Sequence, residues 1–224
     1  MRELPEEPRF ADAGIARHGH ELPLALAGLF QCVAELVHLD LAAHERREAA
    51  RRLRLKARAE RQAETRRRIT EVTVALHEEV GPARTTVAEV ARRAGVTRLT
   101  VYNNFPEERE LLASCQGHWM ALHPLPALDP SEGVEAVLRS LYGWYRETAR
   151  MAENVRRDRL SVEALDELLR ETADARMAAL AAALGGGALT ALALDFWTWR
   201  RLALEEGLSD EQAAALMARA ARLS

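Results

Sequence analysis

The spacing of apolar residues predicts helices along most of this chain, and no stretch shows the alternation of a half-buried strand. A helical repeat of apolar residues runs over residues 22–41 and returns over residues 69–80. Residues 44–68, between them, hold many arginines and few apolar side chains, so we expect a helix there without a wide face to bury. Gly81 and Pro82 end this helical region, because glycine suits the position after a helix and proline cannot continue one.

Two short helices separated by a glycine follow in the segment TTVAEVARRAGVTRLTVYNNF, residues 85–105. Thr86 and Glu89 have the spacing of a capping box, in which the hydroxyl binds a backbone amide of the first turn and the glutamate reaches back to the cap amide. The first helix stops at Gly95, and Thr97 can cap the second. Two short helices joined by a tight turn form a helix-turn-helix, whose second helix enters the major groove of DNA.

The second of these helices has an outward face without a carboxylate. The side chains that we expect on this face are Thr97, Arg98, Leu99, Thr100, Tyr102, Asn103 and Asn104. Hydrogen-bond donors and a cation without an acid, in a chain with 34 acidic residues, favour contacts with phosphates and base edges. An ordinary exposed helix is the alternative.

Charge is unevenly distributed along the chain, whose net charge is −3. Residues 44–68 contain 11 basic and 4 acidic side chains. A local basic segment in an otherwise acidic protein suits a polyanionic partner, and a solvated charged helix is an equally good explanation of the charge alone.

The segment TTVAEVARRAGVTRLTVYNNFPEERELL, within residues 64–112, resembles the tetracycline-repressor (TetR) family of bacterial transcription regulators. The resemblance implies an all-α fold, with an N-terminal helix-turn-helix DNA-binding head of three helices on a larger helical-bundle domain for dimerisation and ligand binding. We accordingly expect an N-terminal extension in residues 1–60, a DNA-binding domain in 61–108, and an effector-binding and dimerisation domain in 109–224. The extension, which we expect to comprise a mobile tail, the apolar helix 22–41 and an Arg-rich helix, departs from the family, in which the head begins earlier.

Carried over by position, the resemblance assigns DNA contacts to eight residues: Thr86, Thr97, Arg98, Leu99, Thr100, Tyr102, Asn103 and Asn104. Thr86 and the Thr97 amide would bind phosphates, Tyr102 and Asn104 would contact the DNA backbone, and the rest would face base edges. Leu99 and Glu108 depart from the family pattern, which often has glycine and a phosphate-binding lysine there. The Arg-rich stretch 44–68 could add contacts to the DNA backbone, with a long solvated helix as the alternative.

Aromatic residues in the C-terminal part predict the wall of a small-molecule pocket, with a plain aromatic core as the alternative. The residues in question are Trp119, Tyr142, Tyr145, Phe196 and Trp199. We expect one helix over residues 161–184, another over 188–206 and a last one after Ser209. Small residues in the last two resemble the helix pair that forms the dimer interface of the family, and an intrachain hairpin is the alternative.

Motifs of other protein classes are incomplete. Cys32 and Cys115 lack CxxC spacing, which argues against a zinc site or a disulfide framework and fits a reducing cytoplasm. Glu35 and His38 have the spacing of a di-iron helix, but no second such motif follows. Phosphate-binding and nucleophile-elbow patterns are missing. We therefore expect no catalytic residue, no metal and no cofactor.

These observations together predict a sequence-specific transcription regulator, a repressor released from a palindromic operator by a small molecule. Its expected partners are double-stranded operator DNA, an effector that is largely apolar or aromatic, and a second copy of the chain as a homodimer. The start of the sequence lacks the apolar core of a signal peptide, and no apolar run is long enough for a membrane span, so we expect a cytoplasmic protein. The alternatives are a DNA-binding regulator without an effector and a structural helical protein.

Overall fold

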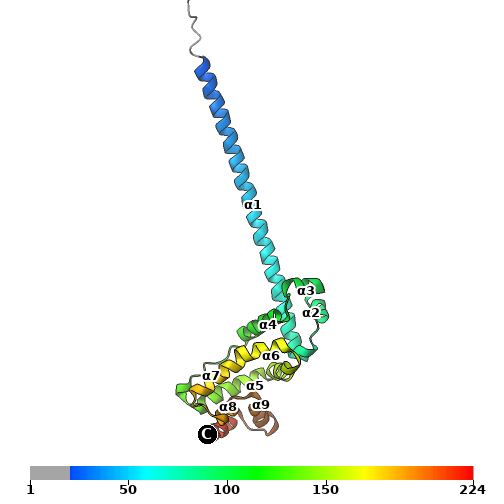
Figure 1. Ribbon diagram of the computed structural model, residues 1–224, viewed down its shortest axis with the longest axis vertical. Helices are drawn as coiled ribbons and strands as arrows, with labels where there is room; N and C mark the ends of the chain where they lie inside the picture. The colour runs from blue at the N-terminus through cyan, green and yellow to red at the C-terminus, as the bar shows by residue number, and fades with distance from the viewer. Residues whose placement is uncertain (1–20, 224) are drawn as a thin grey trace, which may run out of the picture. The chain divides into compact units, whose positions relative to one another are not determined.

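The computed structural model describes the backbone of residues 21–223 and the side chains of Gln31, His38 and residues 43–223. This part of the chain consists of helices and turns without a strand, as Figure 1 shows, and the chain divides into two compact units, Met1–Glu60 and Arg61–Ser224. The mobile tail expected in residues 1–20 lies outside the described residues, as does the side chain of Cys32. No described helix combines the length and the apolarity that crossing a membrane requires.

Helix α1 (Glu21–Val80) belongs to both units. In the first unit, nearly all side chains of residues 44–60 are exposed, and even the apolar side chain of Leu53 is 68% exposed. Ion pairs one helical turn apart, such as Arg52 with Glu48 at 3.4 Å, support this part of the helix. The structure thus confirms a helix without a wide buried face here.

In the second unit, the last turns of α1 pack against α2 (Val87–Ala94) and α3 (Arg98–Asn104) to form a small head. The core of this head consists of Ile69, Leu76, Val90, Ala91, Ala94, Val101 and Phe105. All seven side chains are at most 4% exposed, so hydrophobic burial fixes the two short helices against α1.

Local sequence signals set the starts of the two short helices and the end of the first. The Thr86 hydroxyl accepts a hydrogen bond from the amide of Glu89 at 3.2 Å, and the Thr97 hydroxyl accepts one from the amide of Thr100 at 3.1 Å. Gly95 between the helices has a φ of 64°, a left-handed conformation that costs glycine little. The predicted caps and the glycine turn are therefore confirmed.

The expected capping box at Thr86 is only half formed. The Glu89 carboxylate does not return to the cap amide and instead accepts hydrogen bonds from Arg92 at 2.7 and 2.9 Å and from Arg93 at 2.7 Å. Two guanidinium groups one turn further along offer this carboxylate stronger, charge-assisted bonds than a neutral amide does.

Side chains from α5 (Val134–Asp158) help to satisfy the last carbonyls of α1, which lack helical amide partners. The Gly81 amide donates to the His77 carbonyl at 3.0 Å, and the Arg84 guanidinium donates to the Val80 carbonyl at 3.0 Å. The Asn154 amide donates to two of these carbonyls at 3.0 and 2.8 Å, and the Arg157 guanidinium donates to a third at 3.2 Å; the acceptors are His77, Glu78 and Val80. We call this arrangement of Asn154, Arg157 and Asp158 around the end of α1 the α1–α5 clasp.

The clasp requires a glycine at position 81. Gly81 has a φ of 92°, and a Cβ atom there would overlap the Asp158 carboxylate and the Arg157 guanidinium. The Asp158 carboxylate accepts a hydrogen bond from the amide of Ala83 at 3.1 Å and pairs with Arg157 at 2.7 Å. The glycine thus allows both the turn and the close approach of α5.

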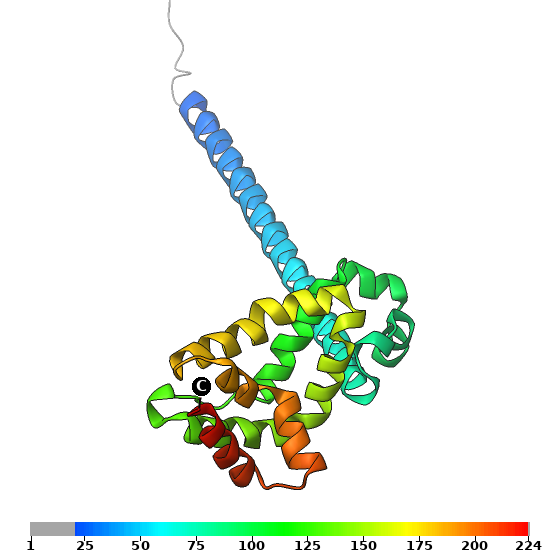
Figure 2. The ribbon, with the colours of Figure 1, turned by 60° about the horizontal axis from the view of Figure 1, so that its bottom comes forward.

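The remaining helices build a body around α5, as Figure 2 shows. Helix α10 packs against α5 and α8, and α4 packs against α6. Besides α5 and the 3-10 turns η2 (Pro130–Glu132) and η3 (Arg159–Ser161), the body comprises α4 (Glu108–Leu122), α6 (Glu163–Leu169), the π-helical turn η4 (Arg170–Asp174), α7 (Ala175–Ala183), α8 (Ala188–Leu194), α9 (Phe196–Arg200), the π-helical turn η5 (Arg201–Glu205) and α10 (Asp210–Ala221).

The single helix expected over residues 188–206 is wrong, because the chain breaks at Asp195. This residue has an extended backbone, and its carboxylate caps α9 by accepting hydrogen bonds from the amides of Trp197 at 2.8 Å and Thr198 at 3.1 Å. The helix expected over 161–184 begins with the 3-10 turn η3 and contains the π-helical turn η4. Only the cap of α10 at Ser209 forms a complete capping box among the caps described.

Two tyrosines from α5 stabilise the break at Asp195. The hydroxyl groups of Tyr142 and Tyr145 donate to the carbonyls of Ala193 at 2.7 Å and Leu194 at 2.8 Å, which end α8. Burial raises the pKa of Tyr145 to about 12 and raises that of Tyr142 as well, so both hydroxyls stay protonated donors at neutral pH. Both tyrosines belong, with Phe196 and Trp199, to the hydrophobic core of the body.

We expect Gly81→Ala to destabilise the protein by about 2–4 kcal/mol, because alanine combines an unfavourable φ with a steric overlap in the clasp. Urea unfolding measures the effect. Gly117→Ala is the matched control, since a Cβ atom there meets no atom within 4 Å and the residue lies inside α4. It should stabilise the protein by about 0.5–1 kcal/mol. Equal effects of the two substitutions would contradict the role of Gly81.

Candidate nucleic-acid interface and ligand pocket

Helix α3 presents most of its predicted contact residues to solvent. Arg98 and Asn103 are exposed, and the large side chains of Leu99 and Tyr102 are 67% and 53% exposed. Two apolar or aromatic side chains held in water next to a cation form a surface that another molecule can cover. Val101 is the buried residue that anchors this helix to the head.

Thr97 and Thr100 form the first turn of α3 as a linked pair. Their hydroxyl groups lie 2.8 Å apart and form a hydrogen bond with each other. Thr100 is half-buried, so part of its side chain remains open to solvent. Thr97 is exposed, as is Thr86 at the start of α2. Both capping threonines therefore lie at helix N-termini, where backbone amides and the helix dipole favour an anion such as a phosphate.

Asn104 lies differently from the outward position that we expected. Its side-chain amide donates to the carbonyl of Thr100 at 2.8 Å, and its side-chain oxygen is buried without a partner among the described residues. The backbone carbonyl of Asn104 accepts a hydrogen bond from Arg66, whose guanidinium also lies 3.8 Å from the centre of the Phe105 ring. Asn104 and Arg66 thus hold the end of α3 on α1.

Arg66 is a residue of the site that sequence reasoning missed. It belongs to the Arg-rich stretch, and nothing in the sequence distinguishes it from its neighbours. Its position depends on the register between α1 and α3, which becomes visible only once the two helices are packed together.

Two carboxylates of the head, those of Glu79 and Glu89, are paired with arginines. Hydrogen bonds from Arg92 and Arg93 lower the pKa of Glu89 to about 2, and Arg93 also pairs with Glu79 at 2.7 Å. These acids therefore stay ionised and neutralised by arginines, which limits their repulsion of a polyanion.

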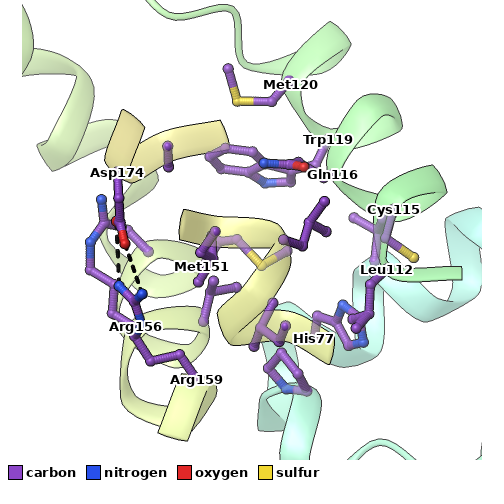
Figure 3. Close-up of a pocket in the computed structure, with 18 of the residues that line it drawn as sticks. His77, Leu112, Cys115, Gln116, Trp119, Met120, Met151, Arg156, Arg159 and Asp174 are labelled. Carbon is purple, nitrogen blue, oxygen red and sulfur yellow. Dashed lines mark hydrogen bonds and ion pairs between the residues drawn. The ribbon is translucent and has the colours of Figure 1, made fainter. Parts of the chain in front are cut away.

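A cavity of about 130 Å³, partly open to solvent, lies between α1, α4, α5 and α6 of the second unit. Its walls are mainly apolar side chains, the kind of lining that small-molecule sites use. Figure 3 shows the Trp119 indole above the centre of the cavity and Met151 below it. His77 and Cys115 lie at one side, and the charged residues Arg156, Arg159 and Asp174 lie at the other (Figure 3).

The groups at the His77 side are neutral at physiological pH. Burial lowers the pKa of His77 to about 4, although Asp158 raises it in part. Burial raises the pKa of the Cys115 thiol to about 12. At this side the cavity thus has weakly polar walls without a formal charge.

The structure divides the aromatic residues predicted for the pocket between a cavity wall and the core. Trp119 lines the cavity just described, whereas Tyr145 and Phe196 line a neighbouring one. Tyr142 and Trp199 are fully buried, and the Trp199 indole donates to the Asp210 carboxylate at 2.9 Å. The pocket prediction does not fit Tyr142 and Trp199, because both complete the body core.

The capped helix pair with its exposed second helix is a helix-turn-helix, an arrangement that many DNA-binding proteins share. Residues 69–115 match the family model of the bacterial regulatory proteins of the tetR family.

Two solved structures are similar to the chain. One is a TetR transcription regulator from Haloarcula marismortui ATCC 43049, with 16% identity and a TM-score of 0.48, covering 72% of this chain and 96% of that one. The other is a TetR transcriptional regulator from Rhodococcus sp. RHA1, with 22% identity and a TM-score of 0.44, covering 73% of this chain and 96% of that one. The search of curated proteins finds no match.

The low pKa of His77 predicts a loss of stability in mild acid. The unfolded chain takes up a proton near pH 6.5 and the folded protein only near pH 4, so the free energy of unfolding falls as the pH drops through this window. From about pH 7.5 to about pH 5, this residue should cost about 2 kcal/mol.

Urea unfolding at both pH values tests this effect. His77→Met should remove that part of the loss, whereas the control His44→Met, at an exposed position of α1, should retain it. An unchanged pH dependence in His77→Met would contradict the assigned protonation state.

Proposed function

We propose that this protein is a transcription regulator of the tetR family, and that it acts as a homodimeric repressor. It would bind a near-palindromic operator through α3 and leave it when a small molecule fills the cavity under Trp119. The single observation that supports this proposal most is the exposed, acid-free face of α3, fixed at its start by Thr97 and at its end by Arg66. A helix fixed at both ends that exposes Leu99 and Tyr102 offers a rigid surface to a partner.

The proposed contacts follow from the chemistry of each side chain. Arg98 can bridge the O6 and N7 atoms of a guanine, Asn103 can bridge the N6 and N7 atoms of an adenine, and Leu99 can contact a thymine methyl group. Thr86 and Thr97 supply phosphate contacts at helix N-termini, and the Tyr102 hydroxyl supplies one to the DNA backbone. Thr100 and Asn104 contribute by shaping the helix ends, with Thr100 still half-exposed to a base edge.

The dimer interface is proposed on the surface of α8 and α10, which pack against each other. Leu192 on α8 and Leu216 on α10 are 49% and 39% exposed. The large apolar side chains offer area that a second helix pair can bury. Small residues such as Ala191 let that pair approach closely. A dimer with two-fold symmetry places two heads on half-sites roughly 34–36 Å apart or slightly more.

Effector control is proposed to act through the α1–α5 clasp. Met151 and Val155 of α5 line the cavity, and Asn154 on the same turns holds the end of α1. His77 belongs to both features, because its side chain lines the cavity and its carbonyl accepts from Asn154. A ligand that fits only one position of α1 against α5 shifts the population away from the DNA-binding form.

We expect Arg98→Ala to relax the preference at one base pair by about 1–3 kcal/mol, because a bidentate contact with guanine is lost. Tyr102→Phe should weaken binding to all sequences alike, since its proposed partner is the DNA backbone. Sequencing of the DNA bound from a random pool gives the preference of each variant. An unaltered operator for Arg98→Ala would show that α3 is wrongly placed in the groove.

The exposed arginines of residues 44–60 are proposed to contact the DNA backbone. A chain that starts at Gln62 should then bind its operator more weakly, and its affinity should depend less steeply on salt, because each phosphate contact contributes about 0.9 to that slope. Operator titrations at several salt concentrations measure both quantities. If the operator affinity and its dependence on salt are the same with and without residues 1–61, the proposed contact is wrong and this stretch is a solvated helix.

A further inference from the structure

The cavity under Trp119 combines an apolar body with a charged side. Its central walls are thioether, indole and aliphatic groups, represented by Met120, Met151, Trp119, Leu165 and Leu168. Such walls accept a flat apolar molecule and offer few hydrogen bonds along its length. The polar groups that orient a ligand must therefore lie at the two sides.

Two of the three charged groups at one side of the cavity neutralise each other. Arg159 pairs with Asp174 at 2.8 Å and with Asp166 at 2.7 Å, so its charge is fully matched. Arg159 donates to both carboxylate oxygens of Asp174, so the negative charge of Asp174 is already neutralised and attracts a cationic ligand only weakly. This network forms a fixed rim of the cavity.

Arg156 is the charged group that remains. Its guanidinium lies 4.9 Å from the centre of the Phe196 ring and 5.7 Å from that of Tyr145, and it forms no ion pair with a carboxylate of the described residues. Arg156 is half-buried and also lines two neighbouring cavities. The two rings orient the guanidinium, which also interacts with the Tyr145 hydroxyl. A guanidinium has five N–H donors, so others remain for a ligand.

The opposite side of the cavity carries no compensating charge. His77 is a neutral imidazole and Cys115 a neutral thiol, as described above. The lining as a whole therefore has one unmatched positive charge, and Figure 3 shows it at the side opposite to His77. A buried anion needs a partner of this kind, whereas a buried cation would meet an unfavourable charge.

We propose that the cavity binds an organic anion, with a flat apolar body under Trp119 and an acid group paired with Arg156. This inference rests on the proposed role of the cavity as the effector site and deepens it by assigning the chemical class of the ligand. Carboxylates and sulfonates share the chemistry that a guanidinium recognises, since each offers two coplanar or nearly coplanar oxygens to its N–H donors.

Two fluorescent probes that differ in a single acid group test the proposal directly. They are 8-anilinonaphthalene-1-sulfonate and its uncharged analogue N-phenyl-1-naphthylamine, each titrated into the full chain without DNA. Arg156→Gln should weaken binding of the sulfonate by roughly 10- to 100-fold, the effect of losing a hydrogen bond to a charged group. Binding of the uncharged probe should change by less than about 2-fold, because its apolar contacts remain.

Three further variants fix the location and the chemistry. Arg150→Gln removes an exposed arginine of the same helix outside the cavity lining, and it should leave both probes unaffected. Arg156→Lys should restore part of the sulfonate affinity. Ala173→Phe, which adds a ring to the half-buried cavity wall, should weaken both probes.

The proposal is overturned by equal losses for the two probes in Arg156→Gln, by no loss for either, or by unchanged binding in Ala173→Phe. A retained affinity of Arg156→Gln for the uncharged probe shows that the variant is folded. Release of operator DNA by the sulfonate is measured separately and tests only the proposed effector control. Arg156-dependent binding without release would keep this inference and contradict that control.

Discussion

The structure depends on how the end of α1 is satisfied. The last carbonyls of a helix lack helical amide partners, and here Asn154 and Arg157 of α5 donate to them, together with the Gly81 amide and the Arg84 guanidinium. Gly81 makes the approach possible, since any side chain there would collide with the Asp158 carboxylate. The head is thus attached to the body through polar contacts of defined geometry, and a shift of α5 changes these contacts directly.

The position of the cavity follows from the same packing. Tyr142 and Tyr145 donate to the end of α8, which places the aromatic core between α5, α8 and α9. The aliphatic cluster of Leu112, Leu165 and Leu168 holds α4 against α6 instead. The cavity lies between these two packed regions. Helix α5 supplies side chains to both regions and to the cavity wall. A ligand there contacts the helix that carries the clasp.

Features that depend on a few neighbouring residues could be predicted from the sequence. The caps at Thr86 and Thr97, the turn at Gly95 and the helix end before Gly81 are local, and each is found where the pattern places it. The break at Asp195 had a local signal as well, because aspartate is a favoured residue at the start of a helix. The strong helix formers on both sides of Asp195 nevertheless predicted one continuous helix.

Features that depend on tertiary register could not be predicted. Asn154 and His77 are 77 residues apart, and Arg66 and Asn104 are 38 apart, so no sequence spacing relates the members of either pair. The aromatic residues illustrate the same limit. Aromatic residues of the core and of the cavity wall both recur at helical spacing in the sequence. Only the packed structure shows that Trp199 is buried in the core and that Trp119 lines the cavity.

The central claim is that α3 reads DNA from a two-fold symmetric dimer. The measurement that tests it most directly is selection from a random pool of double-stranded DNA by the purified protein at two salt concentrations. The account predicts enrichment of one near-palindrome whose half-sites are about one helical turn apart or slightly more, with affinity that falls steeply as salt rises. Failure to enrich any motif at low salt, with protein freed of bound ligand, would contradict it.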